Sequence, residues 1–124
     1  MTQKIIQVGL AGFGMSGQTF QAPFIHAHKS FHLKKVFERS SEKSKIEYPY
    51  VEVVNTFDAL LTEDIDLIII STPNQYHFTM AKQALEAGKN VIVEKPMGVT
   101  ADEGEILCQL AKEKHLLLSP YQNR

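Results

Sequence analysis

Three glycines follow directly on an apolar run near the start of the chain. Residues 4–10 are rich in branched apolar side chains, and Gly12, Gly14 and Gly17 come next. Such a run ending at a glycine predicts a buried strand that closes in a tight turn. Residues 15–22 predict a helix, which places the glycines between a strand and a helix N-terminus. This combination constrains the fold most strongly, because it is typical of the first strand and helix of a parallel α/β sheet.

The spacing of these glycines has a chemical meaning. Gly12 permits the turn, Gly14 leaves no side chain in the path of a phosphate, and Gly17 lets the helix pack closely on the strand. Backbone N–H groups at a helix N-terminus attract an anion. We therefore predict that the pyrophosphate of a dinucleotide binds to the loop formed by Gly12, Phe13, Gly14, Met15, Ser16 and Gly17. A glycine turn without a ligand is the alternative, and the flanking strand and helix count against it.

Strand and helix patterns alternate along the rest of the chain. Further strands are predicted at residues 32–38, 51–54, 66–71, 89–94 and 116–119, and helices at 41–46, 57–62, 74–87 and 100–114. Ser40 and Ser41 are candidate caps for the first of these helices, and Thr100 with Glu103 forms a capping box for the last. Parallel strands require such crossovers. We expect a Rossmann-type doubly wound parallel sheet in three α/β/α layers, with ligands at the carboxyl ends of its strands.

Length, charge and cysteine content exclude several classes of protein. The chain has 124 residues, which suits one domain, and its formal net charge of −1 offers no basic surface for nucleic acid or for an acidic membrane. The N-terminus does not resemble a signal peptide, and the longest apolar run is too short to cross a bilayer, so a cytoplasmic location is expected. Cys108 is the single cysteine, so no disulfide framework or cysteine-based metal site is expected. Its position in a predicted helix indicates a small buried side chain.

An acidic residue ends the second predicted strand. Glu38 stands where a carboxylate can accept hydrogen bonds from the adenosine ribose hydroxyls and repel a 2′-phosphate, which favours NAD over NADP. Arg39 follows it and could instead hold a 2′-phosphate or stack on adenine. An exposed Glu–Arg pair without a ligand is the remaining alternative.

The fourth predicted strand ends in Ser71, Thr72, Pro73 and Asn74. We expect these residues to border the cofactor near its pyrophosphate and nicotinamide ribose. Asn74 is equally well explained as a helix cap. His77 is predicted in the first turn of the next helix, facing the cleft or the solvent. It is a candidate cofactor contact, although histidines at such positions are more often structural or solvated.

Two charged residues and a proline follow at the end of the fifth strand, namely Glu94, Lys95 and Pro96. Charged side chains at the carboxyl end of a buried strand are placed for binding or chemistry. Lys95 could hydrogen-bond a substrate or ribose hydroxyl and stabilise charge that develops during hydride transfer, so it is the candidate catalytic residue. A solvated surface lysine is the alternative.

Two long segments, VGLAGFGMSG and STPNQYHFTMAKQALEAGKNVIVEKP, resemble the N-terminal half of the Gfo/Idh/MocA oxidoreductases. The resemblance covers nearly the whole chain and implies one NAD(P)-binding Rossmann domain over residues 1–124. It also implies that Lys95 lies beside the nicotinamide, and that Thr72 and Pro73 lie against the cofactor. Gln21 stands where many close relatives have histidine.

The resemblance also implies a partner domain. Relatives carry a second, C-terminal α/β domain that supplies an Asp/His pair, shapes the substrate site and often mediates oligomerisation. The chain stops at Arg124, so we expect it to be the cofactor-binding half of a longer enzyme, homo-oligomeric at full length and inactive as a fragment.

The activity implied by the resemblance is an NAD(P)-dependent dehydrogenase that acts on the CH–OH group of a sugar, an inositol or a related polyol. Two alternatives remain open. Some relatives resemble dehydrogenases without acting as such, which would make the protein a non-catalytic NAD(P)-binding sensor or regulator. A domain of this fold could also bind another nucleotide such as S-adenosylmethionine, although such a site would not need Glu94, Lys95 and Pro96.

Overall fold

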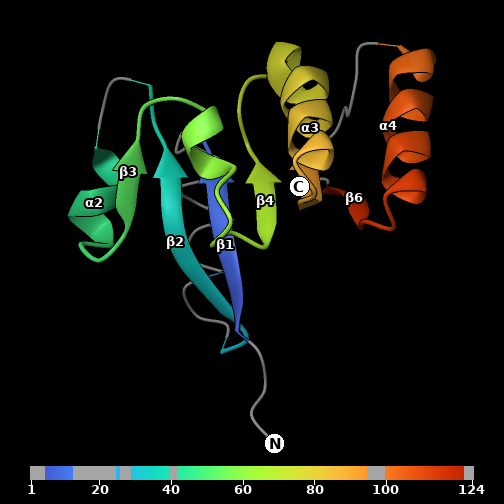
Figure 1. Ribbon diagram of the computed structural model, residues 1–124. Coiled ribbons are helices and arrows are strands. Elements are labelled where there is room, and N and C mark those ends of the chain that lie inside the picture. The colour runs from blue at the N-terminus through green and yellow to red at the C-terminus, as the bar shows by residue number, and fades with distance from the viewer. Residues whose placement is uncertain (1–4, 13–24, 26–28, 40–41, 95–99, 122–124) are drawn as a thin grey trace, which may run out of the picture.

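A single parallel sheet organises the computed structural model, which describes residues 5–12, 25, 29–39, 42–94 and 100–121. Within these residues six strands lie in the order β3-β2-β1-β4-β5-β6 (Figure 1). Their bounds are β1 Ile6–Ala11, β2 Phe31–Phe37, β3 Glu52–Val54, β4 Leu67–Ile70, β5 Asn90–Glu94 and β6 Leu118–Tyr121. The direction of the strand order reverses between β1 and β4. The predicted doubly wound Rossmann-type sheet is therefore confirmed.

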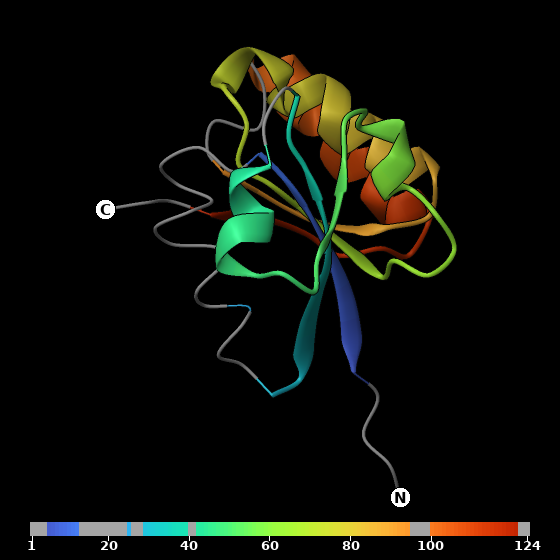
Figure 2. The ribbon, with the colours of Figure 1, turned by 90° about the vertical axis from the view of Figure 1, so that its left-hand side faces the viewer.

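Helices cover both sides of this sheet. Figure 2 shows α3 (His77–Glu86) and α4 (Ala101–Glu113) on one side and the short α2 (Lys43–Glu47) on the other. Two short 3-10 helices, η2 (Asp58–Leu60) and η3 (Asn74–Tyr76), complete the described helical elements. The helix predicted over residues 15–22 lies outside the described residues. None of the helices that the structure describes is long and apolar enough to cross a membrane.

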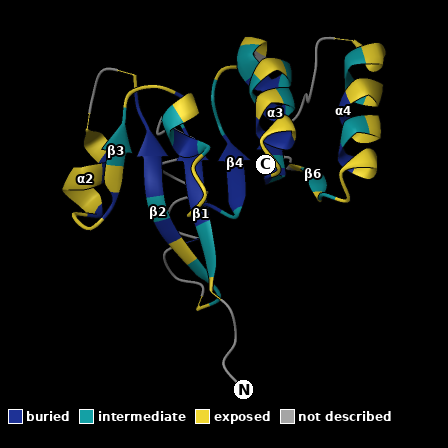
Figure 3. Cartoon of the chain, in the orientation of Figure 1, coloured by how far each residue is buried: buried dark blue, intermediate teal, exposed yellow. Residues whose placement is uncertain are grey.

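The core lies on both faces of the sheet, and β4 is buried along its whole length (Figure 3). Ile68 belongs to a cluster that contains Leu85 of α3, whereas its neighbour Ile69 belongs to a separate cluster that contains Ile25. Successive side chains of a strand point to opposite faces. The uninterrupted apolar run of β4 thus reflects a strand with packed residues on both sides.

The burial predicted for Cys108 is wrong, because its side chain is exposed on α4. This helix buries only Leu107 and Ala111, which stand four residues apart on one narrow stripe. Position 108 lies beside that stripe and not on it. The cap predicted for the start of α4 is confirmed separately from this. The Thr100 hydroxyl accepts a hydrogen bond from the Glu103 N–H at 3.2 Å.

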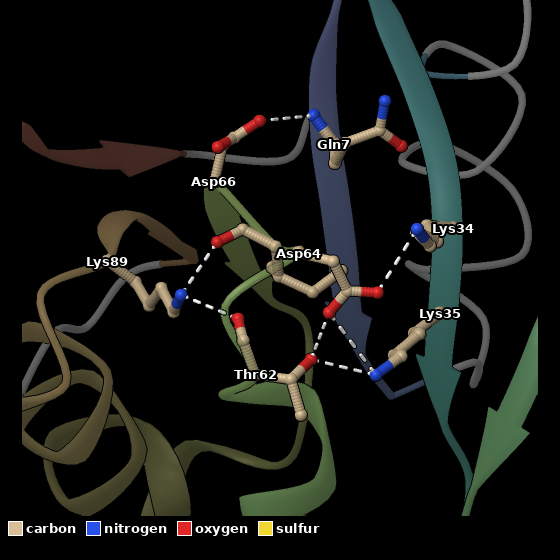
Figure 4. Close-up of polar contacts among 8 residues, drawn as sticks. Gln7, Lys34, Lys35, Thr62, Asp64, Asp66 and Lys89 are labelled. Carbon is tan, nitrogen blue, oxygen red and sulfur yellow. Dashed lines mark hydrogen bonds and ion pairs between the residues drawn. The ribbon is translucent and has the colours of Figure 1, made fainter.

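A polar cluster fixes the loop that leads into β4, at the amino ends of the strands (Figure 4). Lys89 is 8% exposed, and its Nζ donates to the carbonyl oxygens of Thr62 at 2.6 Å and Ile65 at 2.8 Å. Lys35 donates to the Thr62 hydroxyl at 2.8 Å, and that hydroxyl donates to Asp64. Both buried ammonium groups are therefore paired, and the cluster lies at the edge opposite the predicted cofactor site.

Candidate cofactor-binding site

The carboxyl ends of three neighbouring strands are joined by backbone hydrogen bonds. The N–H of Gly12 donates to the carbonyl of Phe37 at 3.0 Å, and the N–H of Ser71 donates to the carbonyl of Ala11 at 2.8 Å. Glu38 follows Phe37 directly, so three predicted site residues lie along one edge of the sheet. This edge includes the point between β1 and β4 where the strand order reverses and where such sheets bind ligands.

Gly12 occupies a position where a side chain would be strained and crowded. Its φ is +97°, a conformation that residues with a Cβ atom rarely adopt. A Cβ atom there would lie 2.9 Å from the carbonyl oxygen of Ser71 and 3.2 Å from the methyl group of Thr72. Gly12 thus has a backbone conformation and a close approach that favour glycine, while the rest of the predicted turn lies outside the described residues. The role of Gly12 toward a pyrophosphate stays a prediction.

Ser71 places a hydroxyl group at the same edge. Its Oγ is buried and makes no hydrogen bond among the residues that the structure describes. An unpaired buried hydroxyl is unfavourable, because it has lost its contacts with water without gaining a protein partner. A bound phosphate or ribose group would give the Ser71 hydroxyl a hydrogen-bond partner, and Gly12 has no side chain that would block its approach. The described residues at this edge therefore fit the dinucleotide that the sequence predicts.

Thr72 is held by contacts on both sides. Its methyl group lies against Gly12, and its hydroxyl donates to the Sδ of Met80 on α3 at 3.4 Å. Pro73 is exposed, and its carbonyl accepts a hydrogen bond from the N–H of Tyr76 at 3.0 Å. Asn74 begins η3 and not an α-helix, so the predicted helix divides into a 3-10 turn and α3.

The prediction that His77 faces the cleft or the solvent is wrong. Its side chain is fully buried, and its Nε2 lies 2.7 Å from the carbonyl oxygen of Thr72. A carbonyl oxygen can only accept, so Nε2 carries the hydrogen in this contact. The structure thus places His77, a candidate cofactor contact, in the protein interior, where it contacts the Thr72 backbone.

Glu38 is buried at the end of β2, with 6% of its surface exposed. Its carboxylate accepts hydrogen bonds from the N–H groups of Lys43 at 3.1 Å and Ser44 at 2.9 Å, and from the Ser44 hydroxyl. These N–H groups belong to the first turn of α2, whose N-terminus attracts negative charge. The serine cap predicted at Ser40 and Ser41 falls outside the described residues, and the described carboxylate performs this role.

An open pocket of about 430 Å³ lies beside Glu38. Two carboxylates and one guanidinium line it, from Glu38, Glu42 and Arg39, and the rest of its lining comes from Val53, Val54, Asn55 and Ala59. The pocket stands at the carboxyl ends of β2 and β3. Its apolar valines and its polar rim suit an adenosine group.

The remaining predicted residues divide into two groups. Glu94 ends β5, is half-buried, and pairs in register with Tyr121 of β6. The others lie outside the described residues, and these are Phe13, Gly14, Met15, Ser16, Gly17, Lys95 and Pro96. Among the described residues, no group of three or more histidine, cysteine or acidic side chains could hold a metal ion.

Comparison with known proteins agrees with this geometry. The family described as "Oxidoreductase family, NAD-binding Rossmann fold" matches residues 6–122. The scyllo-inositol 2-dehydrogenase (NADP(+)) of Bacillus subtilis is 38% identical over 96% of the chain, and an uncharacterized oxidoreductase of Escherichia coli is 42% identical over 96%. A solved Bacteroides fragilis structure, described as a candidate oxidoreductase, is 53% identical over 98% of the chain with a TM-score of 0.95.

The chain spans only part of each of these proteins. It covers 34% and 35% of the two curated relatives and 38% of the Bacteroides fragilis chain. The similarity therefore concerns one domain of each relative. The predicted resemblance to the family is confirmed for this domain.

Proposed function

The chain belongs to the Gfo/Idh/MocA oxidoreductase family, and on this premise we propose that it binds NAD(P) for a dehydrogenase acting on the CH–OH group of a sugar, an inositol or a related polyol. The observation that carries the proposal is the edge formed by Gly12 and Ser71. Gly12 leaves space for a ligand, and the buried Ser71 hydroxyl has no partner among the described residues. Both lie where the strand order reverses. The name of the inositol dehydrogenase relative supports the substrate class.

Each residue of the edge has a proposed task. Gly12 lets the pyrophosphate approach the backbone, and the Ser71 hydroxyl donates to it or to the adjoining ribose. Glu38 and the pocket beside it hold the adenosine end. Lys95 donates a hydrogen bond to the substrate hydroxyl and stabilises the negative charge that builds up on its oxygen. The nicotinamide, when bound, supplies the acceptor for the hydride.

We propose NAD as the preferred cofactor. The pocket lining contains two carboxylates and one guanidinium, so its formal charge is negative. An unphosphorylated ribose therefore fits better than a 2′-phosphate with its two negative charges. NADP is the second candidate, and two observations favour it. Arg39 lines the same pocket and can pair with a phosphate, and the Bacillus subtilis relative is named for NADP(+).

The complete protein is proposed to carry the rest of the active site. Because the chain spans just over a third of its relatives, we propose that a further domain recognises the substrate, supplies the general base and joins subunits into a homo-oligomer. We place this complete enzyme in the cytoplasm.

Titration of the full-length protein tests the proposal. NADH and NADPH should bind, whereas S-adenosylmethionine should not. In a separate assay with NAD+ or NADP+ as the hydride acceptor, inositols or sugars should be oxidised and the reduced cofactor should form. Lys95→Met should lower kcat far more than cofactor affinity, and Lys112→Met, an exposed lysine on α4, is the control. An unchanged kcat in Lys95→Met would refute the catalytic role. Cofactor binding without turnover of any polyol would favour the sensor alternative.

A further inference from the structure

His77 and Thr72 form a contact that closes the segment between β4 and α3 on itself. The segment leaves β4 at Ser71, turns through η3, and brings His77 back to within 2.7 Å of the Thr72 carbonyl oxygen. The imidazole is fully buried, so its Nε2 donor is shielded from water, whereas Thr72, whose carbonyl accepts, is half-buried. A buried donor that lost this acceptor would have no water to replace it, which is unfavourable, so the contact favours one geometry of the segment.

Thr72 transmits this geometry to the glycine turn. Its methyl group packs against Gly12, and its hydroxyl donates to Met80. Three points of attachment, on the carbonyl, the methyl group and the hydroxyl, thus determine where Thr72 sits. A shift of Thr72 would also move the adjoining Ser71 carbonyl, which sets the space above Gly12.

We infer that His77 is a positioning residue of the cofactor site, acting through Thr72 and not by contact with the cofactor. This inference rests on the proposed function, because it assigns Gly12, Ser71 and Thr72 to the bound dinucleotide. A donor on the imidazole Nε2 is the feature that matters. Loss of that donor frees the Thr72 carbonyl, and the edge that the cofactor would contact is no longer held in one arrangement.

A buried residue can fill the core or position a binding site, and the two roles differ in what a substitution changes. A residue that merely fills the core contributes to stability, and its loss leaves cofactor affinity unchanged in the molecules that remain folded. A positioning residue changes affinity as well, and a side chain that keeps the donor restores it. Leu107 of α4 is the matched control, because it is fully buried in the core under α3 and α4.

Three variants of the full-length protein test this difference. His77→Leu keeps a bulky side chain without a donor, His77→Gln keeps an N–H donor, and Leu107→Ala leaves the segment from Ser71 to His77 intact. At a temperature where all are folded, His77→Leu should weaken NADH or NADPH binding about three- to tenfold, the size of one lost hydrogen bond. His77→Gln and Leu107→Ala should bind as the wild type does.

Hydrogen–deuterium exchange gives a readout that needs no cofactor. The backbone N–H groups of residues 71, 72 and 74–77 should exchange faster in His77→Leu than in the wild type, and they should exchange near the wild-type rate in His77→Gln and Leu107→Ala. Unchanged exchange in His77→Leu overturns the inference, as does unchanged affinity, or affinity equally weak in His77→Gln. If the wild type binds neither cofactor, the proposed function fails, and exchange alone decides whether His77 positions the segment.

Discussion

Gly12 and Ser71 approach so closely that a Cβ atom on Gly12 would lie 2.9 Å from the Ser71 carbonyl oxygen. Real Cβ atoms do not come this near to a backbone oxygen, so any side chain at position 12 must displace β1 or β4. Position 12 also lies at the edge of the sheet where the cofactor is proposed to bind. Glycine at this position thus serves both the fold and the proposed cofactor site.

Gly12→Ala should therefore destabilise the protein and weaken cofactor binding. The positive φ alone costs a residue with a Cβ atom about 1–2 kcal/mol, and the overlap with Ser71 adds to this. Gly88→Ala is the matched control, because Gly88 has a φ of +81° but a Cβ atom there would meet no other atom within 4 Å. Thermal unfolding should show a larger loss for Gly12→Ala, and equal losses in the two variants would contradict the close approach.

Ser71→Ala should separate stability from binding. Removal of a buried hydroxyl that has no described partner should leave the melting temperature unchanged or raise it, since an unpaired hydroxyl costs about 1–3 kcal/mol. Cofactor affinity should fall, because the hydroxyl is the proposed donor to the dinucleotide. Ser44→Ala is the control, since the Ser44 hydroxyl is also buried but donates to Glu38. That variant should lose stability, and calorimetric titration would expose a wrong assignment if Ser71→Ala bound NADH normally.

Local patterns predict most of this fold. The apolar run at residues 67–70, the glycine directly after β1 and the Thr100 cap can each be recognised from neighbours in sequence. The structure shows the first as a buried strand, the second with a positive φ and the third with its hydrogen bond. Strand order follows from the alternation of strands and helices, because right-handed crossovers leave few arrangements.

Hydrogen bonds from buried polar side chains to backbone carbonyls are what the sequence does not reveal, whether the carbonyl is near in sequence or far. His77 looks like a polar residue for a cleft or for solvent, yet a carbonyl five residues earlier gives it a partner in the core. Lys89 can be buried because two backbone carbonyls, 24 and 27 residues earlier in the chain, accept hydrogen bonds from its ammonium group. Sequence periodicity reports how apolar a side chain is, and it does not report whether the folded chain will satisfy a polar one.

Glu38 has two tasks that one substitution would mix. Glu38→Ala should raise NADPH affinity relative to NADH, because it removes a negative charge near the 2′ position. The same variant should also lose stability, by about 0.5–2 kcal/mol, because the carboxylate caps α2 through Lys43 and Ser44. Ser44→Ala removes only the hydrogen bond from the Ser44 hydroxyl to this carboxylate and keeps the charge, so it should lower the melting temperature without changing the ratio of NADPH affinity to NADH affinity.

Arg39→Ala completes this test from the other side. If Arg39 pairs with a 2′-phosphate, its loss should weaken NADPH binding and leave NADH binding unchanged. An affinity ratio that is the same in the wild type and Glu38→Ala would refute the assignment of Glu38 as the residue that excludes a 2′-phosphate. Fluorescence titration with both cofactors at a fixed salt concentration measures all of these ratios, because ion pairs with phosphate weaken as salt rises.

Asp64 makes part of the stability depend on pH. A hydrogen bond from the Thr62 hydroxyl, followed by the contact with Lys34 at 3.1 Å, lowers the pKa of the Asp64 carboxyl below its ordinary value. The unfolded chain binds this proton more readily than the folded one. The stabilisation is therefore complete above the unfolded pKa of about 4 and is lost as the pH falls toward the lower folded pKa.

Asp64→Asn should thus lower the melting temperature at pH 7 and have a smaller effect at pH 3. The difference at pH 7 should remain below about 1 kcal/mol, because the carboxylate is 42% exposed and solvent screens its ion pairs. Glu63→Gln changes an exposed neighbouring carboxylate and is the control. Added salt should reduce the effect of Asp64→Asn by screening Lys34, whereas the hydrogen bond from Thr62 should persist. A difference that grows as the pH falls would show that Asp64 does not stabilise the loop in its charged form.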